Sequence, residues 1–193
     1  MISKPRFAAT LIIGCALAMT ACGTPANNTE TTTSPDSTEH SSPTPAATPG
    51  DGTFMDPSAV DRSDVEATAE AAAMLLHSWD TTTDATQTAA AIRAKPLMSK
   101  EWASKQVEPE RNGAQGAWLE PSQHQAFSVP SIVPAVGDTS QDVGKDKAIR
   151  AYNVQWNWRT RDGHEPLDGG QQHVTIYLEK HGGTWDVVGH TFG

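Results

Sequence analysis

The chain has 193 residues, with 14 Lys and Arg against 23 Asp and Glu, so its formal net charge is −9. This balance argues against a nucleic-acid partner and against adhesion to anionic lipid by charge, because both favour clustered Lys and Arg. No cysteine follows Cys22, which excludes a disulfide, a thiolate metal site and a thiol nucleophile from residues 23–193.

The N-terminal residues carry the pattern of an export signal. Lys4 and Arg6 precede an apolar run over residues 7–19, which is too short to span a bilayer and matches the length of a secretory signal. Small residues follow the run and stand directly before Cys22. Signal peptidases require such small residues before the bond that they cut, so the sequence predicts cleavage at this position.

The segment Met19–Cys22 resembles the lipobox of bacterial lipoproteins, with an actinobacterial-type tract after it. The resemblance implies a signal peptide over residues 1–21, acylation of Cys22 with fatty acids such as palmitate, and a lipid anchor on the extracytoplasmic face of the cell membrane. Cleavage there would remove two basic residues and leave a net charge of −11, from 12 Lys and Arg against 23 Asp and Glu.

Two other interpretations of the same segment remain open. Residues 12–15 also fit a lipobox that ends at Cys15, but this leaves an apolar run of only residues 7–13 and puts residues 16–19 into the mature chain. The other alternative is ordinary secretion, with cleavage after Ala21 and no lipid.

A disordered linker is predicted over residues 23–52. The tract is rich in Thr, Ser, Pro and Ala, holds four acidic residues and no Lys or Arg, and has almost no large apolar side chain. Such a composition cannot bury enough surface to offset the loss of chain entropy on ordering. With Cys22 it would form a tether, which leaves residues 53–193 as one domain.

The first predicted helix of this domain covers residues 64–79. Ser63 and Glu66 have the spacing of a capping box, in which each side chain bonds the other residue's backbone N–H. Apolar residues then recur every three or four positions, which defines one face of a helix. That face consists of Val65, Ala69, Ala72, Leu76 and Trp79.

Two shorter helical segments are expected next. Residues 80–84 form a polar break, residues 85–94 a second helix that Pro96 ends or kinks, and residues 97–106 a third helical piece. Pro and Gly residues over 108–116 predict a loop.

The hydrophobic period then changes to that of strands. Residues 124–136 alternate, and the prolines at 130 and 134 indicate an edge strand or a bulge. Residues 137–146 read as a polar turn, and residues 148–158 as a long strand with two distinct faces. One face of the long strand carries Ala148, Arg150, Tyr152, Val154, Trp156 and Trp158.

Two more strands complete the domain. Residues 161–170 are expected to form a hairpin connection, because they contain Asp-Gly and Asp-Gly-Gly. Val174, Ile176 and Leu178 alternate in a third strand, a tight turn is expected at residues 181–183, and the last strand begins at Trp185. Helices followed by an antiparallel meander of about four strands define an α+β class.

The tight turn and the start of the last strand carry the motif Gly-Gly-x-Trp-x-Val-Val over residues 182–188, and helices precede the long antiparallel strands. This combination resembles the NTF2-like (cystatin-like cone) superfamily. The resemblance covers residues 61–192 and implies helices packed on a curved sheet, with Trp185 against the first helix. The segment 79–94 also resembles small actinobacterial envelope proteins associated with conjugative elements. NTF2-like proteins include isomerases, dehydratases, secretion-system scaffolds and dimerisation modules, so the fold by itself implies no single function.

Candidate pocket or contact residues were sought on the predicted strands. Two indoles on one strand face could line a pocket or a partner surface, although they more often close a core. In NTF2-like enzymes an Asp, His or Tyr in the cone acts as a general base, which gives Tyr152, His173, Tyr177 and His190 as wall residues. The candidate set for a pocket or contact is Tyr152, Val154, Trp156, Trp158, His173 and Ile176.

The histidines at 164, 173, 181 and 190 recur every eight or nine residues, and the turn at 181–183 would place His190 opposite Val174 and near His173. Zinc sites usually contain closely spaced ligand pairs, which this series lacks, so we expect no metal and no cofactor. The sequence therefore favours a non-enzymatic envelope lipoprotein that binds other envelope proteins or itself, with a possible role in secretion or conjugation. The alternatives are a cone that binds a small molecule and an enzyme of the isomerase or dehydratase type.

Overall fold

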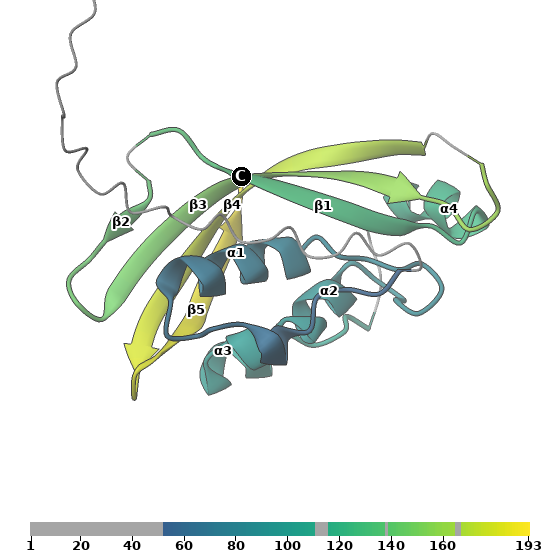
Figure 1. Cartoon of the computed structure of the whole chain (residues 1–193). Helices are drawn as coiled ribbons and strands as arrows, with labels where there is room; N and C mark the ends of the chain where they lie inside the picture. The colour runs from purple at the N-terminus through teal and green to yellow at the C-terminus, as the bar shows by residue number, and fades with distance from the viewer. Residues whose placement is uncertain (1–51, 111–115, 138, 165–166) are drawn as a thin grey trace, which may run out of the picture. The chain divides into compact units, whose positions relative to one another are not determined.

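The computed structural model describes residues 52–110, 116–137, 139–164 and 167–193. These residues form an α+β domain in which helices lie against one face of a bent antiparallel sheet (Figure 1). The predicted class is therefore confirmed. The predicted signal peptide, the lipidated Cys22 and almost all of the predicted linker lie outside the described residues.

The helix α1 (Val65–Leu75) has mostly small side chains and lies close to the sheet. Four of its alanines are at most 3% exposed, and Leu75 is fully buried. Alanine has the highest helix propensity and adds little bulk, so the helix backbone can approach the strands closely. The apolar face predicted from the sequence is confirmed in the main, since Ala69, Ala72 and Leu76 are buried in the same core as the sheet.

The predicted capping box is wrong by one residue. Asp64 is the N-cap, and its carboxylate accepts hydrogen bonds from the backbone N–H groups of Glu66 and Ala67. Ser63 instead donates its hydroxyl to Asp61, and the Glu66 carboxylate accepts from Arg150 on the sheet. The predicted end at residue 79 is also too late, because helix α1 stops at Leu75.

Small helical segments complete the layer on that face. They are η1 (Pro57–Ala59), α2 (Thr88–Arg93), η2 (Lys95–Leu97) and α3 (Lys100–Lys105). The second and third predicted helices are thus confirmed with shorter bounds. Helix α2 ends at Arg93, before Pro96, which lies within the 3-10 turn η2. Helix α4 (Gly116–Gln123) was not predicted, and it contains Pro121 with Trp118 buried beside it.

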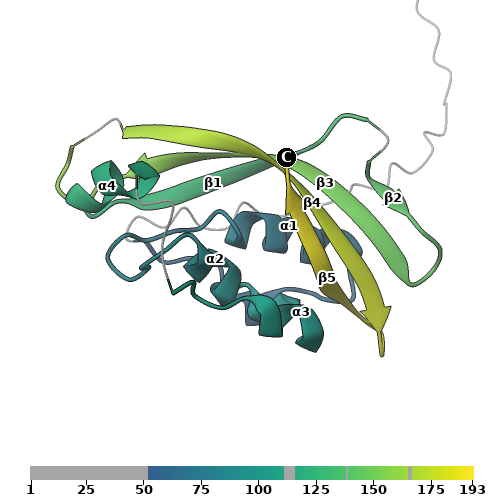
Figure 2. The ribbon, with the colours of Figure 1, turned by 180° about the vertical axis from the view of Figure 1, so that it is seen from behind.

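The sheet has the strand order β1-β3-β4-β5, and the short β2 also pairs with β3. The strands are β1 (Phe127–Pro134), β2 (Gln141–Asp142), β3 (Lys147–Arg159), β4 (Leu167–His181) and β5 (Thr184–Phe192). Strand β2 falls in the region predicted as a turn. Figure 2 shows β4 and β5 with the helices α1, α2 and α3 beside them.

The faces of β3 are as predicted, and they fix which side chains of β1 meet the core. Ile132 lies opposite Val154 and packs on the core, whereas Val133 is 59% exposed. The expected alternation of apolar residues in β1 therefore does not mark its buried face. The register with β3 decides the face, because a shift of one residue turns every side chain over.

The prolines of β1 protect an edge of the sheet. Ala135 N–H donates to the carbonyl of Ala151 at 2.9 Å, so the odd-numbered residues turn their N–H groups toward β3. Even-numbered residues turn theirs to the open edge, and Pro130 and Pro134 have no N–H to offer there. The predicted edge strand is confirmed, and its prolines hinder pairing with another strand.

The expected connection over residues 161–170 is too long, since β4 already begins at Leu167. Gly169 and Gly170 belong to the strand and allow a close approach to Trp156. A Cβ on Gly170 would lie 2.2 Å from Trp156 Cζ2, and one on Gly169 would lie 1.9 Å from Trp156 O. The tight turn before β5 is confirmed, because Gly182 and Gly183 both have positive φ angles, 59° and 96°.

Candidate functional site

The predicted pocket residues divide between the two faces of the sheet. Tyr152, Val154 and Ile176 face the helices and are at most 2% exposed. They belong to one core cluster with α1, so side chains fill the space in which a ligand cavity was considered. His173 lies on the other face, where its Nδ1 is 3.2 Å from Asn153 Oδ1.

The predicted tryptophans join an aromatic cluster, and Trp156 also borders a hollow between β3 and β4. The Trp79 ring lies 5.2 Å from the Trp156 ring and 6.2 Å from the Trp158 ring, and Trp118 of α4 lies 5.9 Å from Trp158. Trp158 is 7% exposed, and Trp156 is partly buried. These contacts support the interpretation of the indoles as core residues.

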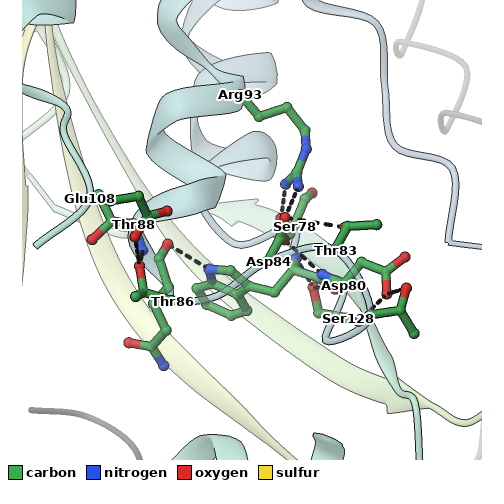
Figure 3. Close-up of polar contacts among 12 residues, drawn as sticks. Ser78, Asp80, Thr83, Asp84, Thr86, Thr88, Arg93, Glu108 and Ser128 are labelled. Carbon is green, nitrogen blue, oxygen red and sulfur yellow. Dashed lines mark hydrogen bonds and ion pairs between the residues drawn. The ribbon is translucent and has the colours of Figure 1, made fainter. Parts of the chain in front are cut away.

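A network of buried polar groups holds the segment between α1 and α2. Asp84 accepts from Arg93 at 2.6 Å and from the backbone N–H of Asp80 at 2.9 Å, and Arg93 also donates to the carbonyl of Ser78 (Figure 3). Thr86 donates to Glu108 in the same region. Each of these side chains ties one loop segment to another.

Asp80 continues this network toward the strands. Its two carboxylate oxygens accept from Arg161 at 3.0 and 2.7 Å, and one also accepts from Thr82. Burial opposes the charge of Asp80, but the hydrogen bonds from Arg161 and Thr82 outweigh it and lower the pKa. Asp80 is therefore a structural anion at pH 7.

A hollow of about 330 Å³ opens beside Arg150. The Arg150 side chain is only 10% exposed, and it donates to Glu66 at 2.5 Å and to Asp142 at 2.8 Å. Burial, followed by the charge of Glu66, raises the pKa of Tyr152, so its hydroxyl stays protonated and cannot act as a base near neutral pH. The hollow is lined by Glu66, Pro134, Ser140, Gln141, Asp142, Arg150 and Tyr152.

A second hollow, of about 260 Å³, lies at the register shift between β3 and β4. Its lining holds three side-chain amides and two glycines but no charged group. The residues are Gln155, Trp156, Asn157, Gly169, Gly170 and Gln171.

The four histidines of the predicted series do not converge. His190 pairs with Ile176, and Phe192 takes the place opposite Val174, so the expected juxtaposition of His190 and His173 is wrong. A register shift in the β4–β5 pair between Tyr177 and Leu178 helps to displace the partner. In the described part of the chain, no group of three or more His, Cys, Asp or Glu side chains is placed to hold a metal ion.

Sequence reasoning missed a buried histidine, His77, at the end of α1. Its Nδ1 lies 2.8 Å from the carbonyl of Ala73 and its Nε2 lies 3.2 Å from Gln172 Oε1. The rings of Trp79, Trp156 and Phe192 each lie 5.6 Å from it. The position of His77 close to Leu75, Leu76 and Trp79 in the sequence was the available signal.

Comparison of the chain with protein-family models, with curated proteins and with solved structures gives no match. No helix among the described residues is long and apolar enough to cross a membrane. The contacts described above therefore carry the functional argument.

Proposed function

We propose that the chain is a lipid-anchored extracytoplasmic protein whose domain works by binding other envelope proteins or a second copy of itself, without catalysis. One observation carries the proposal: the sheet face under α1 is closed, whereas the opposite face exposes side-chain amides at the centre of β3 and β4. Tyr152, Val154 and Ile176 fill the covered side. A small-molecule cone would need a cavity at Val154 and Ile176, and of these three side chains only Tyr152 borders the hollow beside Arg150.

The open face has the composition of a contact surface. The side chains of Asn153, Gln155 and Gln171 are exposed there, as is Val133. Charged residues are depleted in the cores of protein interfaces, and amides can both donate and accept. Two copies could therefore meet at these amides without like-charge repulsion at the point of contact, despite the net charge of −9.

The domain is further proposed to be NTF2-like. A bent antiparallel sheet with α1 against it supports this, as does Trp185 of the last strand, which shares a buried core with α1. The backbone N–H of Trp185 also donates to the carbonyl of Arg62, just before α1. Association with a secretion or conjugation system would suit such a domain and belongs to the same proposal.

The anchor is tested with matched cysteine variants of the full chain in a bacterial host. We expect the unaltered chain to enter the detergent phase of a Triton X-114 partition and to carry the mass of acyl chains. Cys22→Ser should move it to the aqueous phase, and Cys15→Ser should change nothing. A shift caused by Cys15→Ser would instead assign the rival lipobox, and no lipid on either cysteine would contradict the anchor.

Self-association is tested by light scattering of the full chain in detergent, with the detergent contribution subtracted. We expect a dimer that Gln155→Lys dissociates, because the substitution would place like charges at the interface. Lys100→Gln, on α3 away from this face, is the control and should leave the dimer intact. A monomer in the unaltered chain would contradict self-association. If a protein-free membrane extract added to that monomer also fails to produce the dimer, other envelope proteins remain as the partner.

A further inference from the structure

A hydrogen bond between two aromatic rings joins α3 to β5. Trp102 Nε1 lies 3.2 Å from His190 Nδ1, and the two ring centroids are 5.4 Å apart. An indole N–H can only donate, so Nδ1 of His190 must be the acceptor. The neutral ring therefore carries its proton on Nε2.

Protonation of His190 is incompatible with this contact. The added proton would sit on Nδ1 and face the indole N–H, so that two donors would oppose each other. The hydrogen bond would be lost, and a charge would be left in a partly buried position. Burial already lowers the pKa of His190, and the neighbouring His77 lowers it further.

The charged and titratable groups described around His190 do not offset a positive charge on its ring. On α3, Lys105 Nζ lies 5.3 Å from the Trp102 ring centroid and is paired with Glu101 at 2.9 Å. His77, two residues after the end of α1, has its ring 5.6 Å from that of Phe192, which in turn lies 5.1 Å from the His190 ring. Strand β4 places Ile176 opposite His190, and in the described part of the chain His190 forms no ion pair.

Besides this bond, α3 is attached through Ser99 and through Trp102 and Ala103, which pack on the core from partly buried positions. Ser99 caps the helix by accepting from the Trp102 backbone N–H, and the Ser99 backbone N–H donates to the carbonyl of Val187. No residue of α3 is buried. A helix of six residues with one cap and no buried side chain has low intrinsic stability, so its packing decides whether it stays in place.

We propose that His190 and Trp102 form an acid-sensitive latch: protonation of His190 releases α3 from β5 and exposes the indole, while α1 and the sheet remain folded. The released Trp102, together with Phe192, which is already 47% exposed, would enlarge the apolar surface at this edge. The latch does not depend on the lipid anchor or on the contact face proposed above.

Hydrogen exchange of the full chain at about pH 8 and about pH 5, corrected for the intrinsic exchange rates, tests the latch. We expect the amides of residues 100–105 to lose protection roughly tenfold at the lower pH. A change of this size corresponds to the loss of about one hydrogen bond. The amides of α1 should keep their protection. Simultaneous loss of protection in α1 and α3 would overturn a local latch.

Variants distinguish the effect of protonating His190 from the effect of protonating the other histidines. His190→Gln keeps an acceptor for the indole at both pH values and should abolish the pH response, whereas Trp102→Phe should leave α3 weakly protected at both. His181→Gln, at an exposed position, is the matched control and should behave as the unaltered chain. A response that persists in His190→Gln would overturn the proposal.

Discussion

The two faces of the sheet differ in what covers them. Under α1 the side chains of Val154, Val174 and Ile176 are fully buried, because an alanine-rich helix lies directly on them. On the other face Asn153 and Gln155 are exposed, and no described helix covers them. The contrast shows that the covered face serves stability, whereas the open face leaves Asn153 and Gln155 accessible to solvent.

The largest effect should come from the covered face. Ile176→Ala removes buried methyl groups and should lower the free energy of unfolding by about 2–5 kcal/mol. Val133→Ala on the open face should change it by less than about 0.5 kcal/mol. Urea unfolding of the full chain, followed by tryptophan fluorescence, measures both. Equal effects would mean that the two faces do not differ in packing.

A smaller effect is expected where the two central strands touch. In Gly170→Ala the new Cβ would meet the Trp156 indole at 2.2 Å, so we expect a loss of about 1–3 kcal/mol. The control is Gly116→Ala in α4, where nothing lies within 4 Å of the added carbon. The comparison uses the same unfolding measurement. An unchanged stability of Gly170→Ala would contradict the close contact.

The buried ion pair should give a loss of similar or smaller size. Asp80→Asn removes the charge that accepts from Arg161 and should cost about 1–3 kcal/mol near pH 7. Because the pKa of Asp80 is lowered by folding, its contribution is complete above the unfolded pKa and disappears as the pH falls through the folded pKa. The difference between Asp80→Asn and the unaltered chain should therefore shrink in acid.

Glu179→Gln supplies the control for this pair. Glu179 accepts from Lys147 at 2.5 Å, but the Lys147 side chain is 61% exposed. Exposed pairs contribute at most about 1 kcal/mol, so this substitution should have the smallest effect of the set. A cost equal to that of Asp80→Asn would show that burial of the ion pair does not matter here.

Strand alternation was the most informative part of the sequence. The two faces of β3 and the alternation of Val174, Ile176 and Leu178 in β4 were predicted, because side chains in a strand alternate whatever the partner is. The edge position of β1 also followed from its prolines. The buried face of β1 did not, since it depends on the register with β3.

Helix ends and turns were predicted less well. The cap moved from Ser63 to Asp64, because Asp61 engages Ser63 and a strand residue, Arg150, takes the Glu66 carboxylate. Such competition between near and distant partners cannot be read from spacing. Helix α4 was not predicted; its Trp118 is buried against Trp158, a contact that the local sequence does not show.

The candidate site shows the same division. The sequence placed Tyr152, Val154, Trp156, Trp158 and Ile176 on the inner faces of their strands, but it could not decide between a pocket and a filled core. The closeness of α1 decided this in favour of the core. The burial of His77 and the contact between His190 and Trp102 both arise from segments that are far apart in the chain.

The sequence by itself determined the α+β class, the succession of helices before strands, the strand faces of β3 and β4, and the glycine turn before β5, because these follow from local periodicity and backbone preference. Only the tertiary structure decided the registers, the filled face under α1, the pairing of Asp80 with Arg161, and the bond that joins α3 to β5. Those features arise from contacts between residues distant in sequence, whose partners no local pattern specifies.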